Sequence, residues 1–273
     1  MSRMKFTVLL SLYHKESPGF LRQSLESVFS QTLPPDEVVL VEDGPLTSAL
    51  REVVEEYTNE HSELKLVVLD ENRGLGKALN EGLKQCSHDL VARMDTDDIC
   101  KPNRFAKQVA FMEQHQEIDV VGAWIDEFQD GVSNVISTRR LPEKPRDIFR
   151  FGKKRNPINH PVVMFRKKAV EKVGSYKPFY LFEDYYLWVR MMLNGAKLYN
   201  LPEALLYFRF SPDMFKRRGG FKYAFVEIKF QWCLYCLGYI NFICMANNVC
   251  IRMITRVIPN KCRELIYKKL LRK

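Results

Sequence analysis

The chain has 273 residues, of which 46% are hydrophobic and 27% charged, and its net charge at pH 7 is +9. This composition excludes a largely disordered chain and predicts one large domain, or one domain with an appendage, around a sizeable core. Seven cysteines at irregular spacings indicate no disulfide framework, so we expect reduced thiols and a cytoplasmic location.

The positive charge is concentrated at the C-terminal end. Thirteen of the 42 Lys and Arg residues and two of the 33 acidic residues follow Asp213, so this tail carries +11 and the preceding residues −2. The basicity is therefore a property of the tail and not of the main domain.

Apolar runs of strand length alternate with helical patterns along the first half of the chain. The strand-like runs cover residues 6–13, 38–43, 64–70, 89–95 and 119–128. The helical patterns cover residues 19–32, 46–61, 75–86 and 103–115. Runs that are apolar on both faces are typical of a parallel sheet covered by helices. The order predicts an α/β fold with an open, doubly wound, mainly parallel sheet flanked by helices.

Polar side chains follow three of these strands, at the edge where ligands bind in open α/β sheets. They are Ser11, Tyr13 and Glu16 after the first strand, Glu42 and Asp43 at the second, and Asp95, Asp97 and Asp98 after the fourth. Hard divalent cations prefer oxygen ligands, and Mg²⁺ or Mn²⁺ takes one or two carboxylates together with substrate phosphates. We expect Asp95 and Asp97 to hold such an ion against a nucleotide diphosphate. The alternative is an Asp-rich turn that caps the next helix.

A glycine-rich stretch, "NRGLGKALNEG" (72–82), opens the helix after the third strand. The dinucleotide-binding fingerprint would follow the first strand, and no P-loop signature is present. We expect Lys77 and the free amides of this helix start to face an anionic ligand. A simple loop and helix start is the alternative.

Six ordered motifs make the chain resemble the family 2 glycosyltransferases, which have a GT-A nucleotide-sugar-binding domain. The motifs are "VLLSLYHKE", "VEDG", "NRGLGKALNEG", "ARMDTDD", "NHPVVMFRK" and "FEDYYLW". The chain is most similar to bacterial enzymes that build exopolysaccharide, capsule or O-antigen repeats, of the amylovoran-biosynthesis type, and "RRGG" (217–220) fits that subgroup.

The resemblance implies a metal-dependent, inverting transfer of a hexose. The donor would be a nucleotide-diphosphate sugar, expected to be a UDP-sugar, and the acceptor a saccharide hydroxyl, expected to be linked to polyprenyl diphosphate, in bacterial surface polysaccharide synthesis. Mn²⁺ or Mg²⁺ is the implied cofactor. A sugar nucleotidyltransferase and a non-catalytic GT-A-like binding protein stay open as alternatives. The donor sugar, the base, the acceptor sugar and the linkage also stay open.

The resemblance also implies roles for single residues. The implied donor-nucleotide residues are Ser11, Tyr13, Glu16, Asp43, Lys77 and Asp95. Asp97, with Asp95, would bind the metal, and Asp184 of "FEDYYLW" matches the catalytic base. The implied diphosphate or acceptor residues are His160, Glu183, Arg209, Arg217 and Arg218. Ser211 stands where many relatives carry a metal-binding histidine, so the third protein ligand stays open.

The chemistry of inverting transfer accounts for these residue types. The acceptor hydroxyl loses a proton as it attacks, so a carboxylate base is needed within hydrogen-bond reach. The leaving diphosphate gains charge, which a cation and arginines stabilise. The apolar and aromatic surroundings of Asp184 suit a base at a cleft wall. For Glu183 and Asp184 the alternative is a solvated helix start, where the helix dipole favours acids.

An uncharged run of 21 residues, 231–251, is long enough to span a bilayer. Its Asn and Gln residues would be costly in hydrocarbon, whereas a surface helix leaves these amides at the headgroups. We therefore expect residues 1–220 to form the catalytic domain and 221–273 a helical hairpin on an anionic membrane, peripheral on the inner face of the plasma membrane. The alternative is a helix pair docked on the domain. No nucleic-acid module is recognised, so nucleic acid is not an expected partner.

Overall fold

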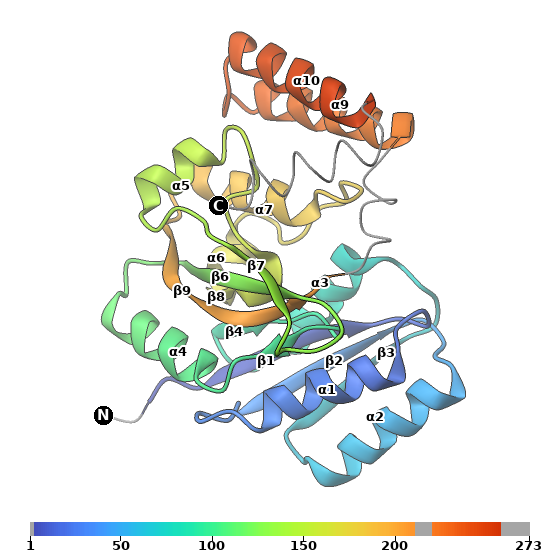
Figure 1. Cartoon of the computed structure of the whole chain (residues 1–273). Helices are drawn as coiled ribbons and strands as arrows, with labels where there is room; N and C mark the ends of the chain where they lie inside the picture. The colour runs from blue at the N-terminus through green and yellow to red at the C-terminus, as the bar shows by residue number, and fades with distance from the viewer. Residues whose placement is uncertain (1–2, 211–219, 258–273) are drawn as a thin grey trace.

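The computed structural model describes residues 3–210 and 220–257 (Figure 1). The first elements are β1 (Phe6–Leu12), α1 (Pro18–Phe29), β2 (Glu37–Asp43), α2 (Ser48–Glu60), β3 (Leu64–Leu69), α3 (Leu75–Gln85), β4 (Leu90–Arg93), β5 (Ile99–Cys100) and α4 (Arg104–Gln114). There follow β6 (Val120–Phe128), β7 (Val135–Arg139), α5 (Pro145–Phe151), the 3-10 helix η1 (His160–Val162), β8 (Met164–Arg166), α6 (Lys167–Lys172), α7 (Glu183–Leu193), β9 (Leu198–Arg209), α9 (Gly220–Cys236) and α10 (Phe242–Val257).

One mixed sheet runs through the molecule in the order β3-β2-β1-β4-β8-β6-β9-β5, and β7 pairs with β6. β3, β2, β1 and β4 are mutually parallel. β8 is antiparallel to both β4 and β6, whereas β6 and β9 are parallel. The α/β class and the parallel order of the first four strands are confirmed, and β5, β7 and β9 are additions that the sequence patterns did not predict.

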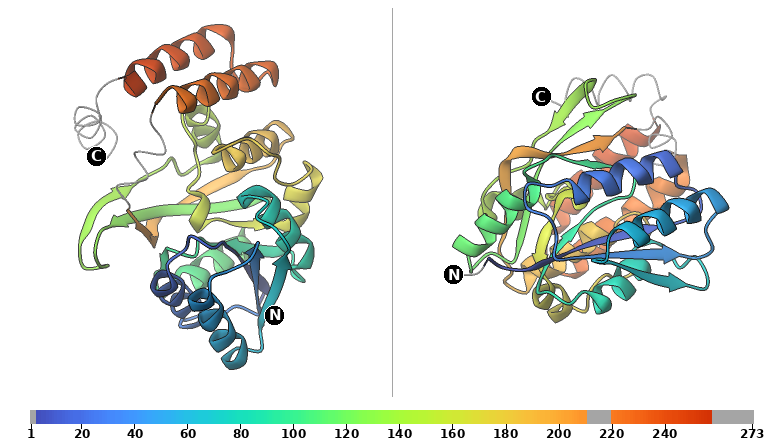
Figure 2. Two further views of the ribbon diagram at one scale, coloured as in Figure 1. Left: turned by 90° about the vertical axis from the view of Figure 1, so that its right-hand side faces the viewer. Right: turned by 90° about the horizontal axis from the view of Figure 1, so that it is seen from below.

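The strands read as continuous apolar runs because both faces of the sheet are covered. Along β1, Phe6, Val8 and Leu10 belong to one buried cluster and Leu9 to the other, as the two-residue period of a strand requires. α1, α2 and α4 pack on the first face, and α3, α6 and α7 on the second (Figures 1 and 2). α3 packs very closely: a Cβ on Gly82 would lie 2.5 Å from the side chains of Leu9 and Val41.

The C-terminal helices α9 and α10 form a hairpin that packs over α5 and α7 (Figure 1). The fully buried ring of Phe230 stacks on Phe182 at 4.7 Å between centroids and lies 4.8 Å from Tyr185. The Tyr239 hydroxyl donates a hydrogen bond to the carbonyl of Phe149 at 2.7 Å. The described part of the tail therefore shares its core with the α7 side of the domain, which is the docked arrangement.

Two polar residues of the uncharged run are buried inside this arrangement. The Asn248 amide donates to the Gln231 side-chain oxygen and to the carbonyl of Lys153, both at 2.8 Å. Asn241 accepts a hydrogen bond from the Cys244 amide at 2.8 Å near the start of α10. The expectation that these amides lie at membrane headgroups is wrong for Asn248 and Gln231, because both are buried and hydrogen-bond to each other within the protein.

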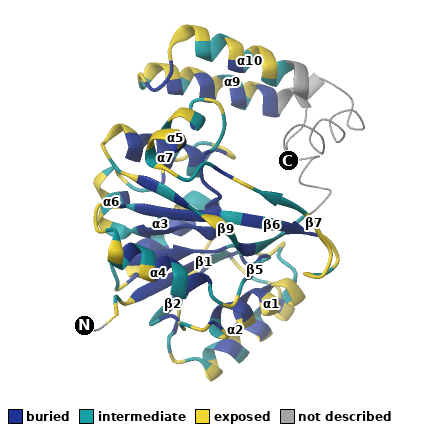
Figure 3. Cartoon of the chain, turned by 60° about the vertical axis from the view of Figure 1, so that its left-hand side comes forward, coloured by how far each residue is buried: buried dark blue, intermediate teal, exposed yellow. Residues whose placement is uncertain are grey.

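The outer side of the α9–α10 hairpin is exposed (Figure 3), and its exposed residues include large apolar side chains. Trp232 is 56% exposed, Phe242 60%, Ile243 69% and Ile251 62%. Within the described residues, no helix combines the length and the apolar character that crossing a bilayer requires.

Phe230→Ala tests whether the hairpin and the domain fold as one unit. Removing a fully buried aromatic ring is expected to lower the free energy of unfolding by about 3–5 kcal/mol. Phe225→Ala, 63% exposed on the same helix, is the matched control and should change it by about 0.5 kcal/mol or less. Urea unfolding followed by circular dichroism measures both. Equal stabilities of the two variants would show that α9 adds nothing to the core.

Candidate active site

The polar ends of β1, β2 and β4 meet at one edge of the parallel half of the sheet. Leu12 lies opposite Glu42, and Leu9 lies opposite Arg93, so the residues that follow these strands emerge side by side. Ligands of open α/β sheets bind at this edge. The predicted position of the site is the one at which the structure gathers the acidic residues.

Asp95, Asp97 and Asp98 form an acidic triad whose carboxylate oxygens lie within 4.8 Å of one another. Asp98 is fully buried, and its Oδ1 accepts a hydrogen bond from the Arg209 backbone amide at 2.9 Å. Its Oδ2 has no hydrogen-bond partner among the residues that the structure describes. Glu16 joins the group from the end of β1, where its Oε2 accepts from the Thr96 hydroxyl at 3.2 Å.

The crowding of these carboxylates changes their acidity. Burial, together with the charges of Asp95 and Glu16, raises the pKa of Asp97 to about 7. Burial and the two neighbouring aspartates also raise the pKa of Asp98, and burial raises the pKa of Glu16. A hard divalent cation fits this arrangement, because it would meet several carboxylate oxygens, one of them buried and unpaired, at a point of surplus negative charge.

Asp43 at the end of β2 shapes the loop before α3. Its two carboxylate oxygens accept hydrogen bonds from the backbone amides of Arg73 at 2.6 Å and Gly74 at 3.0 Å. Gly44 has φ +86°, and a Cβ there would lie 2.6 Å from the Asn72 nitrogen. The carboxylate expected at the nucleotide base is therefore also the one that holds the glycine-rich loop in place.

The remaining donor-side residues lie at the same edge. Ser11 and Tyr13 are partly buried at the end of β1, and the Ser11 carbonyl accepts from the Thr96 hydroxyl at 3.5 Å. Lys77 is exposed in the first turn of α3. All six residues expected to bind the donor nucleotide thus lie at or just after the ends of β1, β2 or β4, or in the first turn of α3.

Glu183 and Asp184 form the first turn of α7. Asp184 Oδ2 accepts a hydrogen bond from the Asn156 side chain at 2.6 Å. Burial raises the pKa of both carboxyl groups. The hydrogen bond from Asn156 lowers the pKa of Asp184, and the charge of Asp184 further raises the pKa of Glu183. A Cβ on Gly76 would lie 3.6 Å from the Glu183 Cβ, so this acidic pair adjoins the start of α3.

His160 begins η1 and is 8% exposed. Its Nε2 lies 2.8 Å from the Tyr176 hydroxyl, and its ring centroid lies 6.0 Å from that of Trp188. Burial and the charge of Arg93 lower the pKa of His160 well below its usual value, so the ring is neutral at pH 7. This placement suits a residue that supports the site from within.

Arg209 is the last residue of β9, and it hydrogen-bonds to the loop that carries Asp97 and Asp98. Besides its backbone contact with Asp98, its Nε donates to the Asp97 carbonyl at 2.8 Å, and its guanidinium lies 3.9 Å from the Phe20 ring centroid. Ser211, Arg217 and Arg218 lie outside the described residues.

Arg93 is a site residue that the sequence patterns did not single out. It ends β4, is 1% exposed and forms an ion pair with Asp95. In the sequence "DLVARM", Arg93 is a single polar residue at the end of a buried strand, and the pattern does not mark it as functional. The available signal was its position two residues after Val91, which places a charged side chain on a covered face of the sheet.

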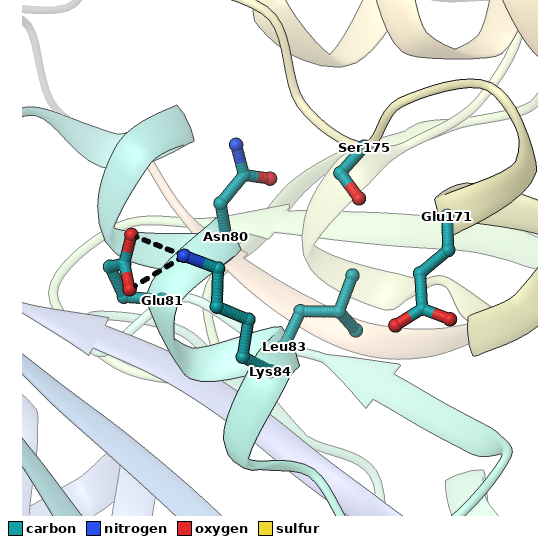
Figure 4. Close-up of a pocket in the computed structure, with 6 residues that line it drawn as sticks. All are labelled: Asn80, Glu81, Leu83, Lys84, Glu171 and Ser175. Atoms are coloured by element: carbon teal, nitrogen blue, oxygen red, sulfur yellow. Dashed lines mark hydrogen bonds and ion pairs between the residues drawn. The ribbon is translucent and has the colours of Figure 1, made fainter.

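Two open surface pockets are not lined by the acidic triad. One, of about 180 Å³, is lined by Asn80, Glu81, Leu83, Lys84, Glu171 and Ser175 (Figure 4). The other, of about 300 Å³, lies around Asp89, Arg166 and Lys172. Neither pocket is lined by a residue of the triad or by Glu183 or Asp184. We therefore assign neither pocket a part in the chemistry of the acidic residues.

The sequence matches the family described as "Glycosyl transferase family 2" over residues 7–174. It is 39% identical over 269 residues to the Escherichia coli UDP-Gal:alpha-D-GlcNAc-diphosphoundecaprenol beta-1,3-galactosyltransferase, covering 98% of this chain and 97% of that protein. It is 43% identical over 264 residues to the amylovoran biosynthesis glycosyltransferase AmsE of Erwinia amylovora, covering 97% and 98%.

The fold is similar to crystal structures of S. aureus TarS. One has a TM-score of 0.63 at 23% identity and covers 98% of this chain but 46% of that one, so the chain spans less than half of that protein. A second, TarS 1-349 in complex with UDP-GlcNAc, has a TM-score of 0.65 at 20% identity and covers 96% and 70%. At these identities the likeness concerns the fold alone.

Proposed function

The chain belongs to glycosyl transferase family 2, and from this premise we propose the reaction that it catalyses. A hexose is transferred with inversion from a UDP-sugar to a hydroxyl of a saccharide carried on polyprenyl diphosphate, in the synthesis of a bacterial surface polysaccharide. The observation that carries the proposal is that the acidic triad at the edge of the sheet lies near enough to the first turn of α7 for the Asp95 charge to raise the pKa of Glu183. The donor and acceptor classes are supported by the E. coli relative, whose name gives UDP-Gal as donor and a GlcNAc-diphosphoundecaprenol as acceptor. The Erwinia relative, named for amylovoran biosynthesis, supports the polysaccharide product, and both relatives match over nearly their full length.

The donor side of the reaction falls to the ends of β1, β2 and β4. Asp95 and Asp97 would hold Mn²⁺ or Mg²⁺, which when bound supplies positive charge to the diphosphate. Asp43 and the loop that it holds would receive the base, and Ser11 and Tyr13 the nucleoside. Lys77, in the first turn of α3, lies where backbone amides and the helix dipole favour a phosphate.

The acceptor side falls to the first turn of α7. Asp184 would take the proton of the attacking hydroxyl, and the hydrogen bond from Asn156 orients its carboxylate. A raised pKa brings the base closer to neutral pH, where proton transfer is most effective. Glu183, beside it, would orient the acceptor. Family membership sets aside the nucleotidyltransferase and the non-catalytic protein.

The exposed face of the α9–α10 hairpin is the part of the described structure that suits a membrane surface. Trp232, Phe242, Ile243 and Ile251 give it an aromatic and aliphatic character, and indole rings favour the interface between lipid and water. The sequence after Asp213 adds thirteen basic residues, which an anionic leaflet attracts. We therefore place the protein in the cytoplasm, peripherally on the inner face of the plasma membrane, where a lipid-linked acceptor is presented.

Asp97→Asn is expected to abolish metal-dependent UDP binding while the fold stays intact, because the ion loses a ligand.

In the wild-type protein a proton competes with the metal ion for the Asp97 carboxylate. With a pKa of about 7, the affinity for Mn²⁺ should fall about tenfold per pH unit below pH 7 and level off above it. Isothermal titration calorimetry measures both effects, with exposed Asp147→Asn as control. Transfer that survives both Asp97→Asn and EDTA would remove the metal from the reaction.

Asp184→Asn is expected to reduce kcat by about two orders of magnitude or more, the range for lost general-base catalysis, with little change in UDP affinity. Asn156→Ala should retain the base but remove the hydrogen bond that lowers its pKa, so the acid limb of the kcat profile should move to higher pH. Steady-state kinetics from pH 5 to 9 measure this. Normal turnover by Asp184→Asn would place the base elsewhere.

Ile243→Gln tests the membrane face. Burying a large aliphatic side chain contributes about 1.5–3 kcal/mol, so the variant should partition about tenfold less onto vesicles of anionic phospholipid in sedimentation assays. High salt should release part of the wild-type protein from the vesicles, because salt screens the attraction between its basic residues and the anionic lipid. Val68→Gln, an exposed aliphatic residue on β3 (61%), is the matched control and should bind like the wild type. Absence of wild-type sedimentation would leave the hairpin as a docked element only.

A further inference from the structure

Arg93 is a buried cation whose hydrogen bonding is incomplete. It is 1% exposed, and only its Nη2 is paired, in the contact with Asp95. Its Nε and Nη1 have no hydrogen-bond partner among the described residues. A donor that is buried without a hydrogen-bond partner destabilises the folded protein, so stability alone does not account for Arg93.

Arg104, a second buried arginine, contacts Arg93 and differs from it in having the hydrogen bonds expected of a structural arginine. Arg104 is fully buried, and each of its guanidinium nitrogens has a partner: Nε donates to Gln108 at 3.1 Å, Nη1 to the Cys100 sulfur at 3.2 Å, and Nη2 to the Arg93 carbonyl at 2.7 Å. It ties β4 to α4. Arg93 makes no comparable set of bonds, which points to its charge as the reason for its presence.

The charge of Arg93 acts on both halves of the site. On one side it contacts Asp95 and acts on Asp97 and Asp98. On the other side it acts on Glu183 and Asp184. The other groups that surround the Asp184 carboxyl are Asn156, Tyr176, Tyr185 and Arg139. Burial would favour the neutral form of the acidic residues on both sides, and a nearby cation opposes this.

We propose that Arg93 is a positioning residue for both half-sites: its ion pair orients Asp95 on the metal side, and its buried charge opposes protonation of the Glu183–Asp184 pair on the acceptor side. This inference rests on the proposed function. It assigns two separable tasks to one side chain, since orientation needs the planar guanidinium and ionisation needs only the positive charge.

Arg93→Met removes both tasks and Arg93→Lys removes only the first. With Arg93→Met we expect weaker binding of UDP with Mn²⁺, and an acid limb of kcat about one pH unit higher, because loss of a nearby opposite charge raises a carboxyl pKa. With Arg93→Lys the acid limb should return to its wild-type position while the binding of UDP with Mn²⁺ stays weakened. Arg104→Met is the matched control: it should lower Tm without moving the acid limb.

The measurements are calorimetry of UDP with Mn²⁺, kcat against pH, and Tm for each variant. A folded Arg93→Met with an unmoved acid limb would overturn the acceptor-side task. If Arg93→Met does not fold, Arg93→Lys decides the metal-side task, which wild-type affinity for UDP with Mn²⁺ would overturn. Wild-type protein that binds UDP with Mn²⁺ but transfers no sugar would contradict the proposed function alone, because the calorimetric comparison needs no transfer.

Discussion

Mutual repulsion among carboxylates is the constraint on which the candidate site depends. The parallel half of the sheet brings the ends of its strands to one edge, and the chain places Glu16 and the acidic triad there. Repulsion between such groups in a partly buried place favours protonation or a cation. The structure counters it with fixed donors: the Arg209 backbone amide on Asp98, the Thr96 hydroxyl on Glu16, and Arg93 beside Asp95. These contacts hold the carboxylates in place, and their negative charge suits a metal ion.

The parts of the fold with regular hydrophobic periodicity could be predicted from sequence alone. β1 and β2 are buried on both faces, so their runs stand out, and the carboxylates that follow them mark the ligand edge. β9 was missed because two exposed residues, Pro202 and Glu203, interrupt the apolar pattern of its sequence, "LYNLPEALLYFR". Its pairing with β6, distant in sequence, decides its structure, and local patterns carry little information about such long-range pairing.

The site could be predicted as a set of residue types but not as a set of contacts. Asp97 and Asp184 were identifiable from motifs that resemble the family, and whether they act as proposed is for experiment. That Asp43 holds the backbone of Gly74, or that Arg93 lies beside Asp95, depends on which elements pack together. The tail illustrates the same limit. Its composition suggested a surface helix, whereas the partner of Phe230 is an aromatic cluster that begins fifty residues earlier.

The packing of Phe230 has a consequence in terms of linkage. Its ring touches Phe182 and Tyr185, which flank Glu183 and Asp184 in the chain. Two binding events that act on one structural element are coupled reciprocally, and the free energy is the same in both directions. Any ligand that favours the docked position of α9 also favours the conformation of the first turn of α7. Binding of an acceptor at that turn would then strengthen the attachment of the hairpin's far side to a membrane. Attachment to the membrane would strengthen acceptor binding by the same factor.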